Sequence, residues 1–149
     1  MLWLVLGAAL LIMWRNSQSA VTSSPASGAQ PPSAGGFSST VQAIANAIAT
    51  AEGYFASGNP LPYRQNNPGD LRDSSGAIAT YDTAADGWNA LYRQVQKMLD
   101  GTSAFYGPDQ TIAQIAVTYT GADNAPSWAA TVAQVLGVDP STPIGDVTA

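Results

Sequence analysis

The order of apolar and polar positions divides the chain into four parts. Residues 2–14 form an uncharged apolar run, and residues 16–36 are almost entirely Ser, Ala, Gly, Pro and Gln. From residue 37 to residue 138, apolar side chains recur at helical spacing between turns rich in Gly and Pro. This pattern predicts one folded domain over 37–138, followed by an irregular tail over 139–149.

The first expected helix begins at a capping box. Ser39 is placed as its N-cap, with the Gln42 side chain reaching back to it. Gly53 is a stop signal, whereas Phe55 extends the apolar stripe and leaves the end of the helix open. The stripe itself consists of residues at helical spacing: Val41, Ile44, Ala45 and Ile48.

The stretch after this helix predicts a loop and a small β-hairpin. Residues 57–69 contain too much Pro, Gly and Asn for regular structure. Residues 70–72 and 77–81 flank a turn at 73–76, which is the arrangement of a short hairpin.

Three more helices follow, each with its own start and stop signals. The start signals are polar pairs three residues apart or a first-turn proline: Thr83 with Asp86, Thr111 with Gln114, and Pro126 before 127–136. The stop signals are glycines: Gly101, Gly121 and Gly137. With the first helix and the hairpin, they predict an α+β fold that is predominantly helical.

The N-terminal part predicts a membrane tether. A helix from Leu2 to Trp14 would be about 20 Å long, shorter than the roughly 30 Å hydrocarbon core of a bilayer. Trp3 and Trp14 at its ends suit the membrane interface. We expect a membrane anchor at 1–15, with a cleaved signal sequence as the alternative, and a flexible linker at 16–36.

Composition narrows the chemistry that is available to the domain. The 149 residues are 46% hydrophobic and 10% charged, with no cysteine and no histidine. These absences exclude disulfides, cysteine nucleophiles, Ser-His-Asp triads and zinc sites built on imidazole or thiolate. Ten acidic against five basic residues give a net charge of −5, which argues against nucleic acid as a partner. We expect neither a metal nor another cofactor.

One acidic residue occupies an unusual position. Nine of the ten are aspartates, and the single glutamate, Glu52, shares a helix face with Ile44 and Ile48. Burial on that face and the nearby helix C-terminus both disfavour the ionised form, so they raise the pKa of a carboxyl. Such a group can act as a general acid near neutral pH. The alternative is an exposed Glu52 paired with Arg64 or Arg72.

The residues around Glu52 resemble a known family. Ala51-Glu52-Gly53-Tyr54, followed by YRQNNPGDLR at 63–72, is similar to the "EG" and "RNNPGNL" segments of phage and bacterial lysozyme-like proteins that degrade peptidoglycan. YDTAADGW at 81–88 resembles the "FxTxxDGWxAL" segment of the same group, the lytic transglycosylase and lysozyme superfamily. The resemblance covers most of 44–138. It departs at Asp70, where Asn is usual, and at Gln65, where Asn or Arg is common.

This resemblance implies a lysozyme-like fold and a reaction. Glu52 would protonate the glycosidic oxygen between MurNAc and GlcNAc in peptidoglycan. A hydrolase also needs a second carboxylate, for which Asp70, Asp73 and Asp82 are candidates. A lytic transglycosylase instead uses the same glutamate as base and the sugar's own 6-hydroxyl as nucleophile. We favour the transglycosylase, with a lysozyme-type hydrolase or a non-catalytic peptidoglycan-binding or virion structural module as alternatives.

The other candidate site residues follow from the same segments. Tyr119, in a segment that resembles the cleft tyrosine of lytic transglycosylases, would position the sugar or stabilise charge, or would pack in the core on the Ile112–Ile115 stripe. Trp88 and Trp128 lie at helical spacing, which favours the core over sugar stacking. The substrate-binding candidates are Tyr54, Arg64, Asn66, Asn67, Asp70 and Tyr81.

Together the parts predict a tethered enzyme. The expected partners are peptidoglycan glycan strands, a lipid membrane contacted through Leu2 to Trp14, and other virion proteins. A tether compensates for the missing basic charge, since it raises the concentration of the domain near the wall. We expect anchoring in a phage virion membrane or a bacterial inner membrane, with the catalytic domain facing the cell wall or periplasm.

Overall fold

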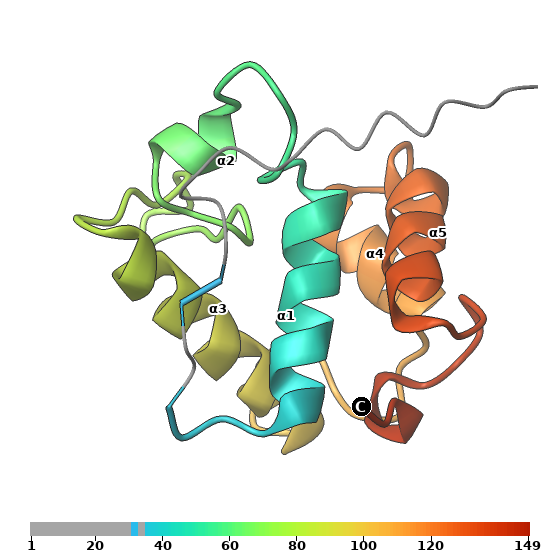
Figure 1. The fold of residues 1–149 in the computed structure, drawn as a ribbon. Helices are drawn as coiled ribbons and strands as arrows, with labels where there is room; N and C mark the ends of the chain where they lie inside the picture. Colours follow the sequence, from blue (N-terminus) through green and yellow to red (C-terminus); the bar gives the residue numbers. More distant parts are fainter. Residues whose placement is uncertain (1–30, 33–34) are drawn as a thin grey trace, which may run out of the picture.

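Helix α1 runs through the centre of the structure, with α3 on one side and α4 and α5 on the other (Figure 1). The computed structural model describes residues 31–32 and 35–149. Over these residues the order of elements is α1 (Ser39–Ala51), α2 (Leu61–Arg64), α3 (Ala84–Leu99), α4 (Ile112–Thr120), α5 (Ala125–Leu136) and the 3-10 helix η1 (Ile144–Asp146). The prediction of a predominantly helical fold is therefore confirmed.

The expected membrane anchor at 1–15 lies outside the described residues, as does most of the linker at 16–36. No helix in the part of the chain that the structure describes has the length and apolar character needed to cross a bilayer.

Helix α1 is the core helix because it is covered on two sides. It packs against α5 and against α3, so apolar residues are buried around much of its circumference. The predicted stripe is confirmed, since Ile44 and Ile48 are 0% and 1% exposed. Ala47 and Ala49 lie off that stripe and are also fully buried. Each buried isoleucine stabilises the fold by roughly 1.5–3 kcal/mol relative to an exposed one.

The start of α1 lies one residue earlier than the sequence predicts. The N-cap is Ser38, whose hydroxyl accepts a hydrogen bond from the Val41 N–H at 3.2 Å, so the prediction of Ser39 was wrong. The Gln42 side chain donates to the carbonyl of Phe37 at 3.0 Å instead of closing a capping box. Phe37, immediately before the cap, packs against the core.

The end of α1 is set by a glycine. Ala51 is the last helical residue and Glu52 is the C-cap, whose backbone N–H donates to the Ile48 carbonyl at 2.9 Å. Gly53 then takes a φ of +75°, a left-handed conformation that favours glycine. Phe55 therefore packs against the core from the following turn, and the helix stops before it.

The segment between α1 and α3 contains a short helix that was not predicted, and its predicted hairpin is smaller than expected. Part of the expected loop forms α2, which follows Pro60 as N-cap and carries Pro62 in its first turn. The expected hairpin is reduced to one antiparallel bridge between Arg72 and Ile78. The turn between them is closed by Asp73, whose carboxylate accepts the Ser75 N–H at 2.8 Å. The tight turn forms, but the flanking residues pair only once.

Two of the three later helices start as the sequence predicts. The Thr83 hydroxyl accepts the Asp86 N–H at 3.2 Å at the start of α3, and Thr111 with Gln114 forms a complete capping box at the start of α4. Helix α5 begins at Ala125, two residues earlier than expected, with Pro126 in its first turn.

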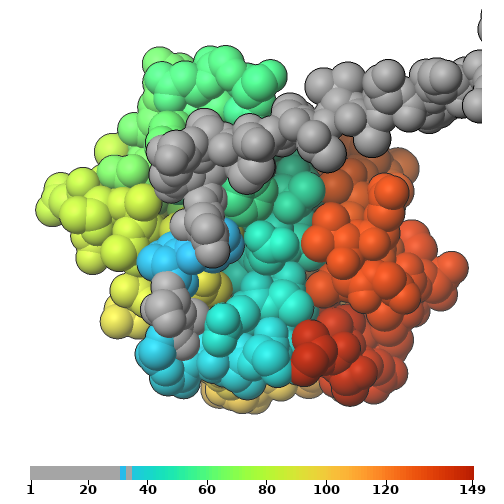
Figure 2. Space-filling model, viewed as in Figure 1, coloured from blue at the N-terminus to red at the C-terminus, as the bar shows by residue number. Residues whose placement is uncertain are grey.

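The C-terminal segment belongs to the folded domain, so the predicted end of the domain at residue 138 was wrong. Apart from η1 and one isolated bridge, the segment is irregular, as predicted. Ile144 in η1 and Val147 are 3% and 4% exposed and lie in the core. The Ser39 hydroxyl donates to the carbonyl of the last residue, Ala149, at 2.6 Å. Figure 2 shows these C-terminal residues against the first turn of α1. The domain therefore extends from residue 37 to the end of the chain.

Candidate active site

The loop after α2 is held rigidly by a buried amide. Asn67 is 0% exposed, and its amide nitrogen donates to the carbonyls of Leu71 and Ala79, each at 2.9 Å. Its amide oxygen accepts the Leu71 N–H, also at 2.9 Å. Because both ends of this side chain are committed to the backbone, Asn67 cannot orient a sugar, and its prediction as a substrate-binding residue was wrong. It fixes the loop instead.

Asn66 has a similar structural role. It takes a left-handed φ of +53°, and its amide nitrogen donates to the Tyr81 carbonyl at 2.9 Å. The first turn of α3 packs directly on its backbone, since a Cβ at Gly87 would lie 1.7 Å from the Asn66 carbonyl oxygen. Only glycine allows this approach. Asn66 therefore joins the loop to α3, and its amide nitrogen is committed to the backbone and not to a substrate.

Tyr119 joins α4 to the same loop. Its hydroxyl donates to the Gly69 carbonyl at 2.5 Å. Its ring lies between two other aromatic rings, 5.0 Å from Trp128 and 5.9 Å from Tyr106, measured between centroids. Burial, followed by the nearby charge of Glu52, raises the pKa of Tyr119 well above its ordinary value. The phenol therefore stays protonated and acts as a hydrogen-bond donor.

Glu52 has the properties expected of a general acid. Its position as C-cap of α1 places the carboxyl against α5, where the Trp128 indole N–H donates to Oε1 at 2.7 Å. The pKa of Glu52 is raised from 4.5 to about 7. Burial is the main cause, the negative charge of Asp70 adds to it, and the Trp128 hydrogen bond opposes it. Close to neutral pH, a substantial fraction of molecules carries a proton on this group.

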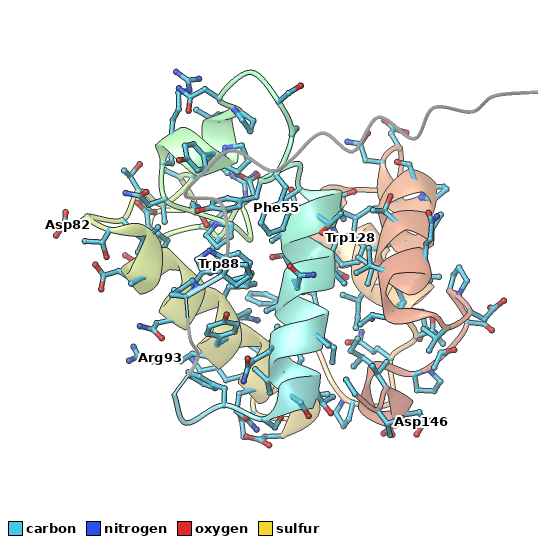
Figure 3. All side chains as sticks on the ribbon, viewed as in Figure 1. Phe55, Asp82, Trp88, Arg93, Trp128 and Asp146 are labelled. Carbon is cyan, nitrogen blue, oxygen red and sulfur yellow. The ribbon has the colours of Figure 1, made fainter. Side chains whose placement is uncertain are left out.

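The alternative environment expected for Glu52, an ion pair with arginine, does not form. Arg64 is exposed on α2, and Arg72 donates from Nη1 to the Gly76 carbonyl at 2.8 Å. Within the described residues, the hydrogen-bond partner of the Glu52 carboxyl is Trp128. Figure 3 shows Trp128 beside the C-terminal half of α1.

One hollow adjoins this acid, and a second lies near it. The first has a volume of about 300 Å³, and its polar lining includes Glu52, the α5 N-cap Asn124, and Ser127 and Thr131 of α5. The second, about 540 Å³, lies between the 70–81 segment, α3, the loop before α4, and α4 itself. Trp128 lines the first hollow and Tyr119 lines the second, so their stacked rings lie between the two. We call the larger hollow the α3 cleft.

The structure brings four predicted site residues together. Asp70, Tyr81 and Tyr119 line the α3 cleft. Glu52, the fourth, lies close enough that the charge of Asp70 raises its pKa and that its own charge raises the pKa of Tyr119. Tyr54 is different, because it is 1% exposed and packs among core aromatic rings, 5.6 Å from Trp88. Its prediction as a substrate-binding residue was wrong.

Among the predicted second carboxylates, Asp70 is the one inside the α3 cleft. Burial raises its pKa and the Arg72 charge opposes this shift. Asp73 is exposed in its turn, where hydrogen bonds from Ser75 lower its pKa, so it is a turn residue. Asp82 is exposed and lies across the molecule from Trp128 (Figure 3). Asp70 is therefore the remaining candidate of the three.

Two site residues were not anticipated from the sequence. Trp128 is 6% exposed, as the core expectation requires, yet it also binds Glu52. A buried indole N–H usually finds an acceptor, and this rule was the available signal. Tyr106 lines the α3 cleft, and its pKa is raised by burial and by the Glu52 charge. It lies in a loop with no periodic pattern, so the sequence gives no signal for it.

Within residues 31–32 and 35–149, no group of three or more Asp or Glu side chains is placed to hold a metal ion. Comparison with known proteins found no matching protein-family model, no matching curated sequence and no matching solved structure.

Proposed function

We propose that this protein cleaves the glycan strands of peptidoglycan between MurNAc and GlcNAc, with Glu52 as the catalytic acid on a lysozyme-like fold. One observation carries the proposal: a carboxyl with a pKa of about 7 is held at a helix end, against a hollow, by a single indole N–H. The choice of peptidoglycan as the substrate rests on the sequence segments around Glu52, which resemble lysozyme-like proteins.

The first step is proton transfer. Neutral Glu52 donates its proton to the glycosidic oxygen while the bond from that oxygen to the sugar C1 breaks, which leaves an oxocarbenium-like sugar. The Trp128 N–H occupies Oε1, so Oε2 is the oxygen that carries the proton. The same N–H bond strengthens as Glu52 becomes an anion, and it therefore stabilises the product of the step.

The second step separates the two candidate reactions. In a lytic transglycosylase, the Glu52 carboxylate takes the proton of the sugar 6-hydroxyl while that oxygen bonds to C1, giving a 1,6-anhydro product. This route uses one carboxyl, and Glu52 alone meets its requirements. We therefore propose the transglycosylase as the main reaction.

Asp70 supports the second candidate, a lysozyme-type hydrolase. It lines the α3 cleft, and its charge influences Glu52, so it could assist water or the developing cation. The raised pKa of Asp70 weakens this role, because a base or nucleophile must be ionised. Tyr119 is proposed as a positioning residue, since its hydroxyl is committed to the Gly69 carbonyl next to Asp70.

The proposed setting follows from the N-terminal sequence. An anchor at 1–15 and a linker at 16–36 would hold the domain near the cell wall, in a phage virion membrane or a bacterial inner membrane. Other virion proteins are proposed partners in the first of these settings.

The test is digestion of purified sacculi by the full chain in mild detergent, beside Glu52→Gln and Asp70→Asn. We expect 1,6-anhydro products, identified by mass spectrometry, from the wild type and from Asp70→Asn, and none from Glu52→Gln. Reducing-end products that disappear with Asp70→Asn would establish the hydrolase instead. Equal release by wild type and Glu52→Gln would refute the catalytic role of Glu52, and no release by folded wild-type protein would leave a non-catalytic binding module.

A further inference from the structure

The basic residues of this acidic chain are concentrated in one place. The sequence has five Lys and Arg residues, of which Arg15 lies outside the described residues. Of the remaining four, three line the α3 cleft: Arg72, Arg93 and Lys97. A chain of net charge −5 gains little from such clustering through long-range attraction to an anionic surface. The arrangement instead provides a local positive region in a cleft.

Helix α3 presents most of this positive charge. Arg93 and Lys97 are four residues apart, so they lie on the same face of α3, and both side chains are exposed. Like charges at this spacing destabilise a helix, and an anion bound between them would remove that cost. Arg72 contributes less, because its guanidinium donates to the Gly76 carbonyl and lies near Asp70. Figure 3 shows Arg93 projecting from α3 on the side away from α1.

Apolar surface lies beside these cations. Phe105 lines the α3 cleft and is 71% exposed, although it is one of the largest apolar side chains in the domain. Its ring makes an edge contact with Tyr106, with 6.3 Å between centroids. Leu71 lines the same cleft. A ligand that fits this surface carries anionic groups together with small apolar ones.

We propose that Arg93 and Lys97 bind the free carboxylates of the peptide stems attached to the glycan, so that the protein prefers peptidoglycan with anionic stems. This inference rests on the proposed function, which supplies a glycan at Glu52. Asp70 and Tyr106 line the α3 cleft and lie close enough to Glu52 for their charges to interact, so the stem of a glycan bound at Glu52 can reach the cleft. Carboxylates would meet the two cations, and alanine-type methyl groups would meet Phe105.

The test uses binding, so that it is independent of cleavage. The full chain carrying Glu52→Gln is titrated in mild detergent with soluble glycan strands whose stems are intact, and with the same strands after chemical amidation of their carboxylates. Two further proteins carry, in addition, Arg93→Gln with Lys97→Gln or the charge-preserving Arg93→Lys with Lys97→Arg. Since each exposed ion pair contributes weakly, we expect about a fivefold rise in Kd on amidation and about the same rise with the two Gln substitutions.

Comparing the three proteins on both kinds of strand tests whether Arg93 and Lys97 bind the stem carboxylates. The doubly neutral protein should bind intact and amidated strands equally, the charge-preserving protein should keep the preference, and 0.5 M salt should abolish it. Equal binding of both strands by the parent protein would overturn the inference. So would a preference that survives the two Gln substitutions. If Glu52-dependent cleavage occurs without any charge preference, this inference alone fails, whereas the absence of both binding and cleavage removes the proposed function as well.

Discussion

Replacing Trp128 by Phe tests the central claim about Glu52, because it removes one hydrogen bond and keeps an aromatic ring. The indole N–H donates to Glu52 Oε1 at 2.7 Å, and this bond favours the ionised carboxylate. Phenylalanine retains a ring near Tyr119, whose centroid lies 5.0 Å from that of the indole. Without the N–H, the ionised form of Glu52 loses stabilisation and its pKa rises above about 7.

The size of this rise follows from the strength of the lost bond. A hydrogen bond to a charged group contributes about 1.5–3 kcal/mol, and the lower end applies because Glu52 is only partly buried. A change of about 1.4 kcal/mol moves a pKa by one. We therefore expect the pKa of Glu52 in Trp128→Phe to lie near 8. The acid form would persist to higher pH, while the carboxylate formed after proton transfer would be less stable, so the maximal rate should fall.

The assay is the pH dependence of kcat/KM for anhydro-product release from sacculi. In wild type, activity should fall as pH rises through about 7, where Glu52 loses its proton. In Trp128→Phe, this fall should move up by about one pH unit, with a lower plateau at acidic pH. An unchanged or downward-shifted profile, in a protein that melts like wild type, would refute the claim that this N–H stabilises the ionised acid.

Trp88→Phe is the matched control. Trp88 is 0% exposed, and its indole N–H has no hydrogen-bond partner in the described structure. The substitution removes an indole from the core without touching Glu52, so the pH at which activity falls should stay the same. A shift equal to that of Trp128→Phe would mean that general loosening of the core, and not the lost hydrogen bond, changes the pKa.

Three further variants test other parts of the structure. The pKa of Glu52 is raised from 4.5 to about 7, so the folded protein loses stability as pH rises through that window. Glu52→Gln removes this loss. After discounting for partial exposure, we expect it to stabilise the protein by about 1–2 kcal/mol at pH 8 and by little at pH 4, measured by thermal melting. Gly87→Ala should cost about 3 kcal/mol in denaturant unfolding, because its Cβ would meet the Asn66 carbonyl oxygen at 1.7 Å; a stable variant would contradict this packing. Tyr119→Phe leaves the Gly69 carbonyl without its donor and should lower stability by about 1–3 kcal/mol, with the pH profile of activity unchanged; an altered profile would give the phenol a part in proton transfer.

The sequence predicted those elements whose signals are local. Caps at Thr83 and Thr111, and stops at Gly53 and Gly121, depend on hydrogen bonds within four residues, and the structure has all of them. The end of the domain depends on contacts between residues far apart in the sequence, and there the prediction was wrong. The tail is ordered because Ile144 enters a core that residues 37–138 create, and no pattern within 139–149 indicates it.

The same distinction applies to the site. Glu52 could be found because its position on an apolar helix face implies its environment. Asn66 and Asn67 could not be assigned, because an amide in a turn has the same sequence signature whether it binds a ligand or its own backbone. Hydrogen bonds to residues 4 to 15 positions away decide the matter here. Trp128 was placed in the core, and its contact with Glu52 spans 76 residues, beyond the reach of any local pattern.

The arrangement of charge also bears on why the acid should be neutral before it reacts. A substrate with carboxylates would approach a protein of net charge −5, and an ionised Glu52 beside Asp70 would repel it further. Burial keeps a substantial fraction of Glu52 protonated near neutral pH, so the same desolvation that prepares the proton donor also reduces the negative charge on the binding surface. Arg93 and Lys97 then provide attraction on α3, away from the acid, where they do not lower its pKa. Cations placed next to Glu52 would improve binding but ionise the acid, so placing them in the α3 cleft, apart from the hollow that Glu52 lines, preserves both functions.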